Sequence, residues 1–377
     1  MRIVLISNYT PDQQESMSRF AQMLKKGLVA EGYECEVWRP NIVLGRYYKN
    51  HSFGLGKWLG YVDKWVIYPL ILRGKTRGRR WTTDDVRFHI CDHSNAPYLR
   101  YLPAGKSSIT CHDVLAIRGA LGFADAHCPA SRFGILLQKW ILRSLLGASK
   151  IAFDSGATFR QLSELLRDND TQRPGWKVIH CAFNADFYRM KTTRSRSLLK
   201  EALVPAKSYI LHVGSNLPRK NRKLLIDVLT CLGDKWDGNV CFAGQPADGD
   251  LLRYADENGH GHRVFSVEGP GHESLNALYC GCTALMFPSW SEGFGWPVIE
   301  AQACGAAVIA SNIQPMPEVG GAGAIYADPN LAETFSEAFL SLSDPVRKEE
   351  LISLGFENAR RFDLSQMTSF YVALFEA

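Results

Sequence analysis

The chain has 377 residues, of which 46% are hydrophobic and 21% are charged, and its formal net charge is +5. This length exceeds what one hydrophobic core usually serves, so the sequence predicts two domains, and the composition excludes a disordered protein. The ten cysteines form no Cys-x-x-Cys pair. We therefore expect reduced thiols packed as small apolar groups, with metal binding by Cys280, Cys282 and a nearby His as the weaker alternative.

Short apolar segments alternate with helical patterns along the chain. Strands are expected at Ile3–Ser7, Glu34–Trp38, Phe88–Asp92, Ser108–His112, Ile151–Asp154, Val178–Ala182, Tyr209–Gly214, Val240–Gly244, Val264–Val267, Ala284–Phe287 and Ala307–Ala310, with helices at Ser18–Ala30, 132–147 and 157–167. This alternation predicts an α/β protein with parallel sheets covered by helices on both faces. Residues 186–207 lack apolar periodicity and are predicted to be a linker.

No targeting or membrane-spanning segment is expected. Arg2–Ser7 is too short for the apolar part of a signal peptide and lacks a cleavage site. The most apolar candidate span, Trp58–Leu72, contains Asp63 and Lys64 and is shorter than a bilayer requires. We therefore expect a cytoplasmic protein.

Positive charge is concentrated in the first half of the chain. Residues 1–190 hold 27 Lys and Arg against 16 Asp and Glu, whereas residues 191–377 hold 16 against 22. The densest patch, Arg73–Arg80, follows the aromatic run Trp58–Leu72. A basic loop after an ordinary packed helix is the preferred interpretation; an amphipathic segment resting on anionic lipid at the inner membrane face is the alternative. No nucleic-acid-binding module is recognisable, so nucleic acid is not expected as a partner.

The segment 284–300 combines a strand end, a glycine loop and a helix start. The buried strand Ala284–Phe287 is closed by a proline, and Gly293 and Gly295 give the backbone of the following loop room for positive φ and for a close ligand. Pro297 suits the first position of a helix, where a missing N–H costs no hydrogen bond. The amides of Val298 and Ile299 are then expected to be free and to form an anion site with the helix dipole.

Two carboxylates flank this expected anion site. Glu292 lies on the loop, and Glu300 lies one turn into the helix, where a carboxylate accepts hydrogen bonds from a diol such as ribose. A nucleotide sugar fits this order, with ribose at one end, diphosphate in the middle and the sugar at the other end. The alternative is that the two Glu residues are paired by chance and that Glu300 is a solvated residue of the first helical turn.

The wider sequence favours the functional interpretation. Phe-Pro-Ser, Glu-Gly-Phe-Gly with Phe294, and Pro-Val-Ile-Glu-Ala-Gln-Ala-Cys-Gly follow one another over residues 287–305. This order, and the spacing of Glu292 and Glu300, resemble the Glu-x7-Glu retaining glycosyltransferases (group 1, family 4 type), which include sucrose synthases and bacterial lipopolysaccharide and mannosyl transferases. Where relatives usually have a smaller aliphatic residue, this chain has Trp296, which narrows the expected sugar pocket.

The resemblance implies the GT-B fold, in which two doubly wound Rossmann-like domains flank an interdomain cleft that holds the ligand. We expect an acceptor-binding domain at 1–190 and a nucleotide-sugar-binding domain at 205–358. In that family the last helix crosses back to the first domain, as 360–377 is expected to do here; a simple helix on the second domain is the alternative.

Ser215–Asn221 follows the strand Tyr209–Gly214, where the carboxyl ends of parallel strands collect ligands. It resembles the family's Gly-…-Pro-Arg-Lys-Asn element, which implies a substrate-binding glycine at Gly214 and a diphosphate held by Lys220 first and Arg219 second. Many relatives have an Arg directly after the glycine, a position that Ser215 occupies here. A basic surface turn is the alternative.

In the first domain, His112 ends the strand 108–112 beside an aspartate. Its place resembles the family's first-domain His that touches the donor sugar; a hydrogen-bonded core histidine is the alternative. Asp92 and His93 end a similar strand and are candidates for the acceptor side. The glycine-rich loop that often follows the first strand of such enzymes is absent, and 8–12 stands in its place.

Together these features predict an enzyme that transfers a sugar from a nucleoside diphosphate sugar (GDP-mannose or a UDP-sugar) to a hydroxyl of a glycan or lipid-linked acceptor. Retention of anomeric configuration is what the resemblance implies. His112 and Glu292 are the expected catalytic residues, and no metal or other cofactor is expected because Arg219, Lys220 and the helix start neutralise the leaving diphosphate. A nucleotide-sugar epimerase, a non-catalytic nucleotide-sugar-binding protein and a dinucleotide dehydrogenase are the rival hypotheses.

Overall fold

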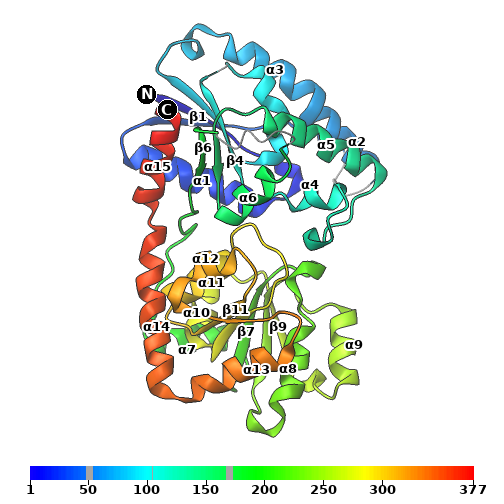
Figure 1. The fold of residues 1–377 in the computed structure, drawn as a ribbon, viewed down its shortest axis with the longest axis vertical. Coiled ribbons are helices and arrows are strands. Elements are labelled where there is room, and N and C mark those ends of the chain that lie inside the picture. The colour runs from blue at the N-terminus through cyan, green and yellow to red at the C-terminus, as the bar shows by residue number, and fades with distance from the viewer. Residues whose placement is uncertain (48–53, 104, 167–172) are drawn as a thin grey trace. The chain divides into compact units, whose positions relative to one another are not determined.

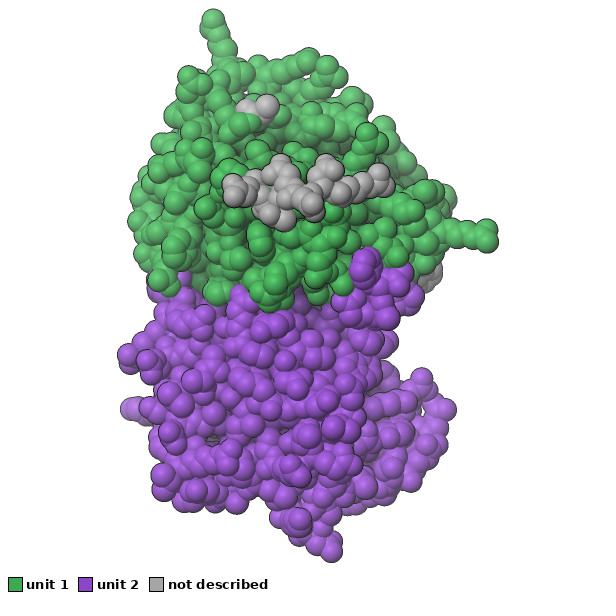
Figure 2. Space-filling model, viewed as in Figure 1, with its two compact units in different colours: residues 1–121, 130–184, 364–377 green, residues 122–129, 185–363 purple. Residues whose placement is uncertain are grey.

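The structure is a computed structural model that describes residues 1–47, 54–103, 105–166 and 173–377. The chain divides into two compact units (Figures 1 and 2). Unit 1 contains residues 1–121, 130–184 and 364–377, and unit 2 contains residues 122–129 and 185–363. Each unit is built around one parallel six-stranded sheet with helices on both faces.

The sheet of unit 1 has the strand order β2-β1-β3-β4-β5-β6. Its strands are β1 (Arg2–Ile6), β2 (Glu34–Trp38), β3 (Val86–Ile90), β4 (Ser107–Cys111), β5 (Ile151–Phe153) and β6 (Trp176–Val178). Its helices are α1 (Glu15–Ala30), α2 (Gly54–Val62), a π-helical stretch (Asp63–Ile67), α3 (Tyr68–Thr76), α4 (Leu115–Ala120), α5 (Arg132–Leu146), α6 (Gly156–Ser163) and α15 (Leu364–Glu376).

The two faces of this sheet are buried by different helices. One face packs Phe88 and Ile109 against residues of α3 and α5 in a single apolar cluster. The other face carries His89, whose ring lies 5.2 Å from that of Tyr371 on α15. α1 and α15 pack closely where Gly27 faces Thr368. A Cβ at position 27 would lie 2.0 Å from Thr368 Oγ1, so this close packing requires a glycine.

The sheet of unit 2 has the order β12-β11-β10-β7-β8-β9. Its strands are β7 (Tyr209–Gly214), β8 (Asn239–Gly244), β9 (Val264–Glu268), β10 (Ala284–Phe287), β11 (Val308–Ser311) and β12 (Ile325–Ala327). Its helices are α7 (Thr192–Glu201), α8 (Leu224–Leu232), α9 (Gly249–Glu257), α10 (His272–Gly281), α11 (Trp296–Ala303), α12 (Met316–Gly320), α13 (Ala332–Leu340) and α14 (Pro345–Ala359).

Successive residues along the central strands of unit 2 enter opposite cores. On β10, Met286 belongs to the cluster that contains residues of α8, α9 and α13, whereas Leu285 belongs to the cluster that contains residues of α10 and α11. Strands buried on both faces need continuous apolar runs instead of alternating ones, which is why Ala-Leu-Met-Phe is apolar throughout.

The predicted α/β class and the two parallel-sheet, Rossmann-like domains are confirmed. The linker expected at 186–207 is wrong in its central part, because α7 occupies 192–201 and packs against α10. The face of α7 that packs against the rest of unit 2 is narrow. It includes Ser195, which is buried, and Leu199, which lies beside Gly281. The sequence reading also missed β12, a strand of three residues.

The aromatic run that follows residue 53 is helical from Gly54 to Thr76 through α2, the π-helical stretch and α3. Within the described residues, no helix is long and apolar enough to cross a bilayer.

Candidate functional site

The candidate site of unit 2 lies where the order of strands reverses. β7 comes first in the chain and is central in the sheet, the chain then builds β8 and β9 on one side, and β10 returns to the other side. Ligands of open parallel sheets collect at such a switch point, beyond the carboxyl ends of the strands. The loops after β7 and β10 carry the predicted residues Arg219, Lys220 and Glu292.

These three side chains meet in one ion-paired cluster. Lys220 Nζ lies 2.6 Å from Glu292 Oε1, and Arg219 Nη1 lies 2.7 Å from Glu292 Oε2. Arg219 Nη1 also donates to the carbonyl of Ser291 at 2.7 Å. Glu292 and Lys220 are both 8% exposed, so this is a buried pair and its charges are poorly screened by water.

Burial and charge act against each other within the cluster. Burial alone would raise the pKa of Glu292, but Lys220 and Arg219 outweigh it and hold the pKa below its ordinary value. Burial lowers the pKa of Lys220, Glu292 opposes that change, and Arg219 adds to it. Glu292 is therefore an ionised acceptor held by two cations that would otherwise repel each other.

Backbone contacts hold the two loops together. The Trp290 N–H donates to the carbonyl of Arg219 at 2.9 Å. Asn221 adopts a left-handed conformation with φ of 51°, and its Nδ2 donates to the carbonyls of Pro288 at 3.3 Å and Pro329 at 2.7 Å. Asn tolerates this backbone conformation better than most residues, so Asn221 turns the chain and ties it to the end of β10.

The loop after β10 leads into α11 through Gly293, Phe294 and Gly295. Gly295 has φ of 104°, and a Cβ there would lie 2.6 Å from Met316 Cε. Trp296 is the first helical residue and Pro297 the second. The Val298 N–H donates to the carbonyl of Gly295 at 3.0 Å, so the expectation that this amide is free for a phosphate is wrong. The first turn of α11 is tight enough for the Val298 N–H to bond within the turn.

Glu300 lies on α11 and is 5% exposed. Its Oε2 accepts a hydrogen bond from Tyr279 Oη of α10 at 2.8 Å. A solvated first-turn Glu is therefore not what the structure shows, and Tyr279 fixes the orientation of the carboxylate. Sequence reasoning did not single out Tyr279, because a Tyr within an apolar helix pattern carries no signal of its partner.

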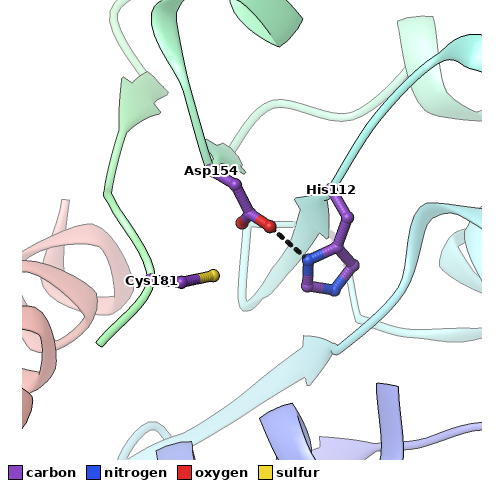
Figure 3. Close-up of side chains that lie close together, drawn as sticks. All are labelled: His112, Asp154 and Cys181. Atoms are coloured by element: carbon purple, nitrogen blue, oxygen red, sulfur yellow. Dashed lines mark hydrogen bonds and ion pairs between the residues drawn. The ribbon is translucent and has the colours of Figure 1, made fainter. Parts of the chain in front are cut away.

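Unit 1 brings His112, Asp154 and Cys181 together beyond the ends of β4, β5 and β6 (Figure 3). His112 Nδ1 lies 2.5 Å from Asp154 Oδ2, and one donor atom from each of the three residues lies within 4.8 Å of the others. Imidazole, carboxylate and thiol suit zinc. However, burial and Asp154 raise the pKa of the Cys181 thiol well above its ordinary value, and both His112 nitrogens are engaged, so a metal would have to displace existing bonds.

His112 is held from several sides. Its Nε2 lies 2.7 Å from the carbonyl of Cys91, and the ring of Phe20 packs on it edge to face at 4.7 Å. Burial alone would lower the pKa of His112, but Asp154 and more weakly Asp92 raise it to about 9. A ring with two donor nitrogens matches both acceptors, so His112 is an imidazolium at neutral pH.

A further polar cluster lies at the switch point of unit 1, beyond β1 and β3. Asn8 Nδ2 donates to Asp92, and Asp92 also accepts from the N–H of Ser94 at 2.9 Å and from its Oγ at 2.7 Å. Asn95 Nδ2 donates to Asn8 Oδ1 at 3.1 Å. His93 Nδ1 makes no hydrogen bond within the described residues, and it lies 3.4 Å from Asp92 Oδ1. Asp92 and His93 were predicted for this edge of the sheet, whereas Asn8 was noted only as part of a loop without glycines.

Comparison with known proteins gives a family match that lies within unit 2. Residues 196–352 match the family model of the group 1 glycosyl transferases. The chain is 28% identical over 193 residues to O-antigen chain mannosyltransferase B of Escherichia coli, which covers 50% of the chain and 51% of that relative. It is 34% identical over 129 residues to the E. coli serotype-specific mannosyltransferase WbdA, which covers 33% of the chain and 16% of that relative. The chain thus spans about half or less of these curated relatives.

Solved structures of glycosyltransferases share the fold over the whole chain. The sucrose-phosphate synthase of Thermosynechococcus elongatus superposes with a TM-score of 0.73 at 17% identity and covers 100% of this chain and 98% of its own. WaaG, a glycosyltransferase involved in lipopolysaccharide biosynthesis, gives 0.71 at 13% identity, with 99% of each chain covered. Anabaena HepE in complex with UDP and glucose gives 0.70 at 16% identity, with 100% of each covered.

The pair of His112 and Asp154 should make stability depend on pH. The folded pKa of His112 is raised from 6.5 to about 9, so the contribution of the pair, about 3 kcal/mol by the size of the shift, is complete below pH 6.5 and is lost as the pH rises through about 9. The melting temperature of Asp154→Asn should therefore lie furthest below that of the wild type near about pH 6 and should approach it by about pH 10. The exposed control Asp234→Asn should differ from the wild type equally at every pH. A gap for Asp154→Asn that does not change with pH would contradict this assignment.

Proposed function

We propose that this protein, whose residues 196–352 match the family model of the group 1 glycosyl transferases, transfers a sugar from a nucleoside diphosphate sugar to a hydroxyl of a glycan or lipid-linked acceptor. The observation that carries the proposal is the cluster at the β7–β10 switch point, where two cations share one buried carboxylate. Glu300 stands eight residues beyond Glu292, at the Glu-x7-Glu spacing.

The cluster suits a diphosphate because the diphosphate can take the place of Glu292 on the cations. Arg219 and Lys220 are donors only, and a phosphate offers them more negative charge than a carboxylate. Once the diphosphate binds them, Glu292 is released to accept hydrogen bonds from sugar hydroxyls. After the exchange the cations are paired with the diphosphate and Glu292 is hydrogen-bonded by sugar hydroxyls, so no charged group of the cluster is left buried without a partner.

The transition state of glycosyl transfer places positive charge on the sugar ring and negative charge on the departing phosphate. Arg219, Lys220 and the positive end of the α11 dipole stabilise the leaving group, and Glu292 stabilises the ring. We expect these groups to replace a divalent cation. Glu300, oriented by Tyr279, accepts hydrogen bonds from the ribose.

The remaining predicted residues of unit 2 are proposed to lie beside the donor sugar and its diphosphate. Gly214 has φ of 148° and lies against Lys220, which lets the end of β7 approach the ligand closely. Gly293, Phe294, Gly295 and Trp296 form the wall beside the sugar, and Val298 takes part through packing because its amide is engaged.

His112 is proposed as the residue of unit 1 that positions the donor sugar. Since both ring nitrogens are engaged, Nε2 must give up the carbonyl of Cys91 to contact a sugar hydroxyl. Asp154 would keep its hold on Nδ1 and so preserve the charge and direction of the ring.

The mannosyltransferase relatives favour GDP-mannose as the donor, with UDP-sugars second because a structural neighbour was solved with UDP. Retention of anomeric configuration is proposed from the Glu-x7-Glu spacing. The products of such relatives, O-antigen chains, also favour a glycan or lipid-linked acceptor.

We further propose that unit 1 rests on the inner face of the membrane. The helical run from α2 to α3 buries Tyr68 and Leu72 in the core but leaves Leu55, Trp58 and Leu70 between 52% and 65% exposed. Arg73, Lys75, Arg77, Arg79 and Arg80 follow, and all are exposed. A peripheral contact with anionic lipid requires exposed apolar side chains and basic ones, and this helical run with the segment after it carries both.

A donor panel tests the main proposal. We expect GDP-mannose or a UDP-sugar to release its nucleoside diphosphate in the presence of EDTA when a mannose-containing acceptor is supplied, with the α-linkage of the donor kept in the product. Nucleotide release measures the transfer, and the anomeric proton signal of the product shows whether the α-linkage is kept. Absence of transfer from GDP-, UDP- and ADP-sugars alike would overturn the proposal, and transfer that requires added Mg²⁺ or Mn²⁺ would overturn its metal-free form.

Two variants of the cluster should change nucleotide affinity in opposite directions. Glu292→Gln frees both cations, so UDP or GDP should bind about tenfold more tightly, while turnover should fall about a hundredfold because the sugar loses its carboxylate. Lys220→Met should weaken nucleotide binding about tenfold and lower turnover as well. The exposed control Lys200→Met should change neither quantity. Calorimetry and nucleotide release measure the two effects, and equal shifts of affinity in both variants would argue against the exchange at Glu292.

The membrane contact predicts binding to vesicles that contain phosphatidylglycerol and weaker binding to vesicles of phosphatidylcholine alone. Replacing Leu55, Trp58 and Leu70 together with Ser should lower the bound fraction severalfold in a sedimentation assay. Replacing Leu203 and Leu331, which are 89% and 49% exposed in unit 2, with Ser is the matched control. Equal loss in the control, or no binding by the wild type, would refute this contact.

A further inference from the structure

Unit 2 contains a second candidate site beside the ion-paired cluster. A cavity of about 310 Å³ is lined by Asn216, Arg222, Lys223, Asp248 and Trp290, among others. Arg219, Lys220, Glu292 and Glu300, which form the proposed donor site, do not belong to its lining. The cavity therefore has its own set of polar groups.

Arg222 is the group in this cavity that most needs a ligand. Its side chain is 7% exposed, and among the described residues Nε, Nη1 and Nη2 are all buried without a hydrogen-bond partner. The guanidinium lies over the ring of Phe242 at 4.5 Å, which supports one face of the group but satisfies none of its N–H donors. A buried cation with no hydrogen bond is costly unless an anion or water fills the space beside it.

A second donor in the cavity is also unsatisfied. Trp290 Nε1 is buried and has no hydrogen-bond partner in the part of the chain that the structure describes, and the indole ring is fixed by stacking on His127 at 5.1 Å. Arginine and tryptophan side chains can only donate hydrogen bonds. The complementary ligand must therefore carry acceptors, and next to a guanidinium the strongest acceptor is an oxyanion.

The acidic side chains in the cavity wall indicate which groups the rest of the ligand carries. Asp248 caps α9 by accepting a hydrogen bond from the N–H of Leu251 at 2.9 Å. Burial lowers the pKa of Arg222, and the charge of Asp248 partly opposes that change. Asp250 stands beside it in the wall. Carboxylates accept hydrogen bonds from hydroxyl groups, and the volume exceeds that of a single phosphate ion and suits a ligand the size of a monosaccharide.

We propose that this cavity binds a sugar that carries a phosphate or a carboxylate, with Arg222 and Trp290 holding the oxyanion and Asp248 and Asp250 accepting from its hydroxyl groups. The proposal does not depend on glycosyl transfer, since the unsatisfied donors call for a ligand whatever reaction the neighbouring site performs.

Calorimetry on the full chain tests the proposal with glucose 6-phosphate, glucuronate, glucose and inorganic phosphate. At least one of the two charged sugars should bind, and both glucose and inorganic phosphate should bind about tenfold more weakly, since each lacks half of the contacts. The stronger of the two charged sugars identifies phosphate or carboxylate as the oxyanion. Binding of neither, or equal binding of glucose or of inorganic phosphate, would overturn the proposal.

Two variants locate the site. Arg222→Met should bind the charged sugar at least about tenfold more weakly. Lys220→Met should keep the wild-type affinity, because Lys220 belongs to the proposed donor site and does not line this cavity. Trp290→Phe, which keeps an aromatic ring but removes Nε1, should lose about threefold and serves if Arg222→Met does not fold. Loss in Lys220→Met with full binding in Arg222→Met and Trp290→Phe would place the ligand elsewhere and overturn the assignment.

Discussion

The ion pairing of Glu292 with Lys220 and Arg219 is the interaction on which the site of unit 2 depends. Two cations placed this close repel each other, and burial adds to that cost, so the loop after β7 adopts this form only because a carboxylate from the loop after β10 lies between them. Asn221 and the backbone bond of Trp290 hold the two loops in register. The sheet brings the loops together, and charge then fixes their side chains.

Much of this arrangement could be predicted from the sequence. The strands 209–214 and 284–287 match β7 and β10 because apolar runs buried on both faces are easy to recognise. The Arg219–Lys220 pair and Glu292 were found because they stand in the loops after these strands, within segments that resemble the Pro-Arg-Lys-Asn and Glu-x7-Glu elements. Their direct contact was not predicted, since it depends on the order of strands in the sheet and not on spacing along the chain.

Other features could not be read from the sequence for physical reasons. α7 was missed because its exposed face is so polar that a narrow packed stripe around Ser195 and Leu199 gives no visible period. Val298 was assigned a free amide because the tightness of a helix's first turn depends on dihedral angles, which the position of Pro297 does not determine. The partners of His112 were hidden for a third reason. Asp154 follows another strand, β5, and sequence alone does not say which strand ends are neighbours.

The packing of α15 has a consequence for how the chain acquires its structure as it is made. α15 supplies Tyr371 and Phe375 to the face of the first sheet that carries His89, and Thr110 joins Tyr371 by a hydrogen bond of 2.9 Å. On the ribosome, residues 1–184 emerge long before 364–376 exist. The place of α15 on this face of the sheet therefore stays uncovered while all of residues 185–363 is translated, and unit 1 is completed only after unit 2 has been made.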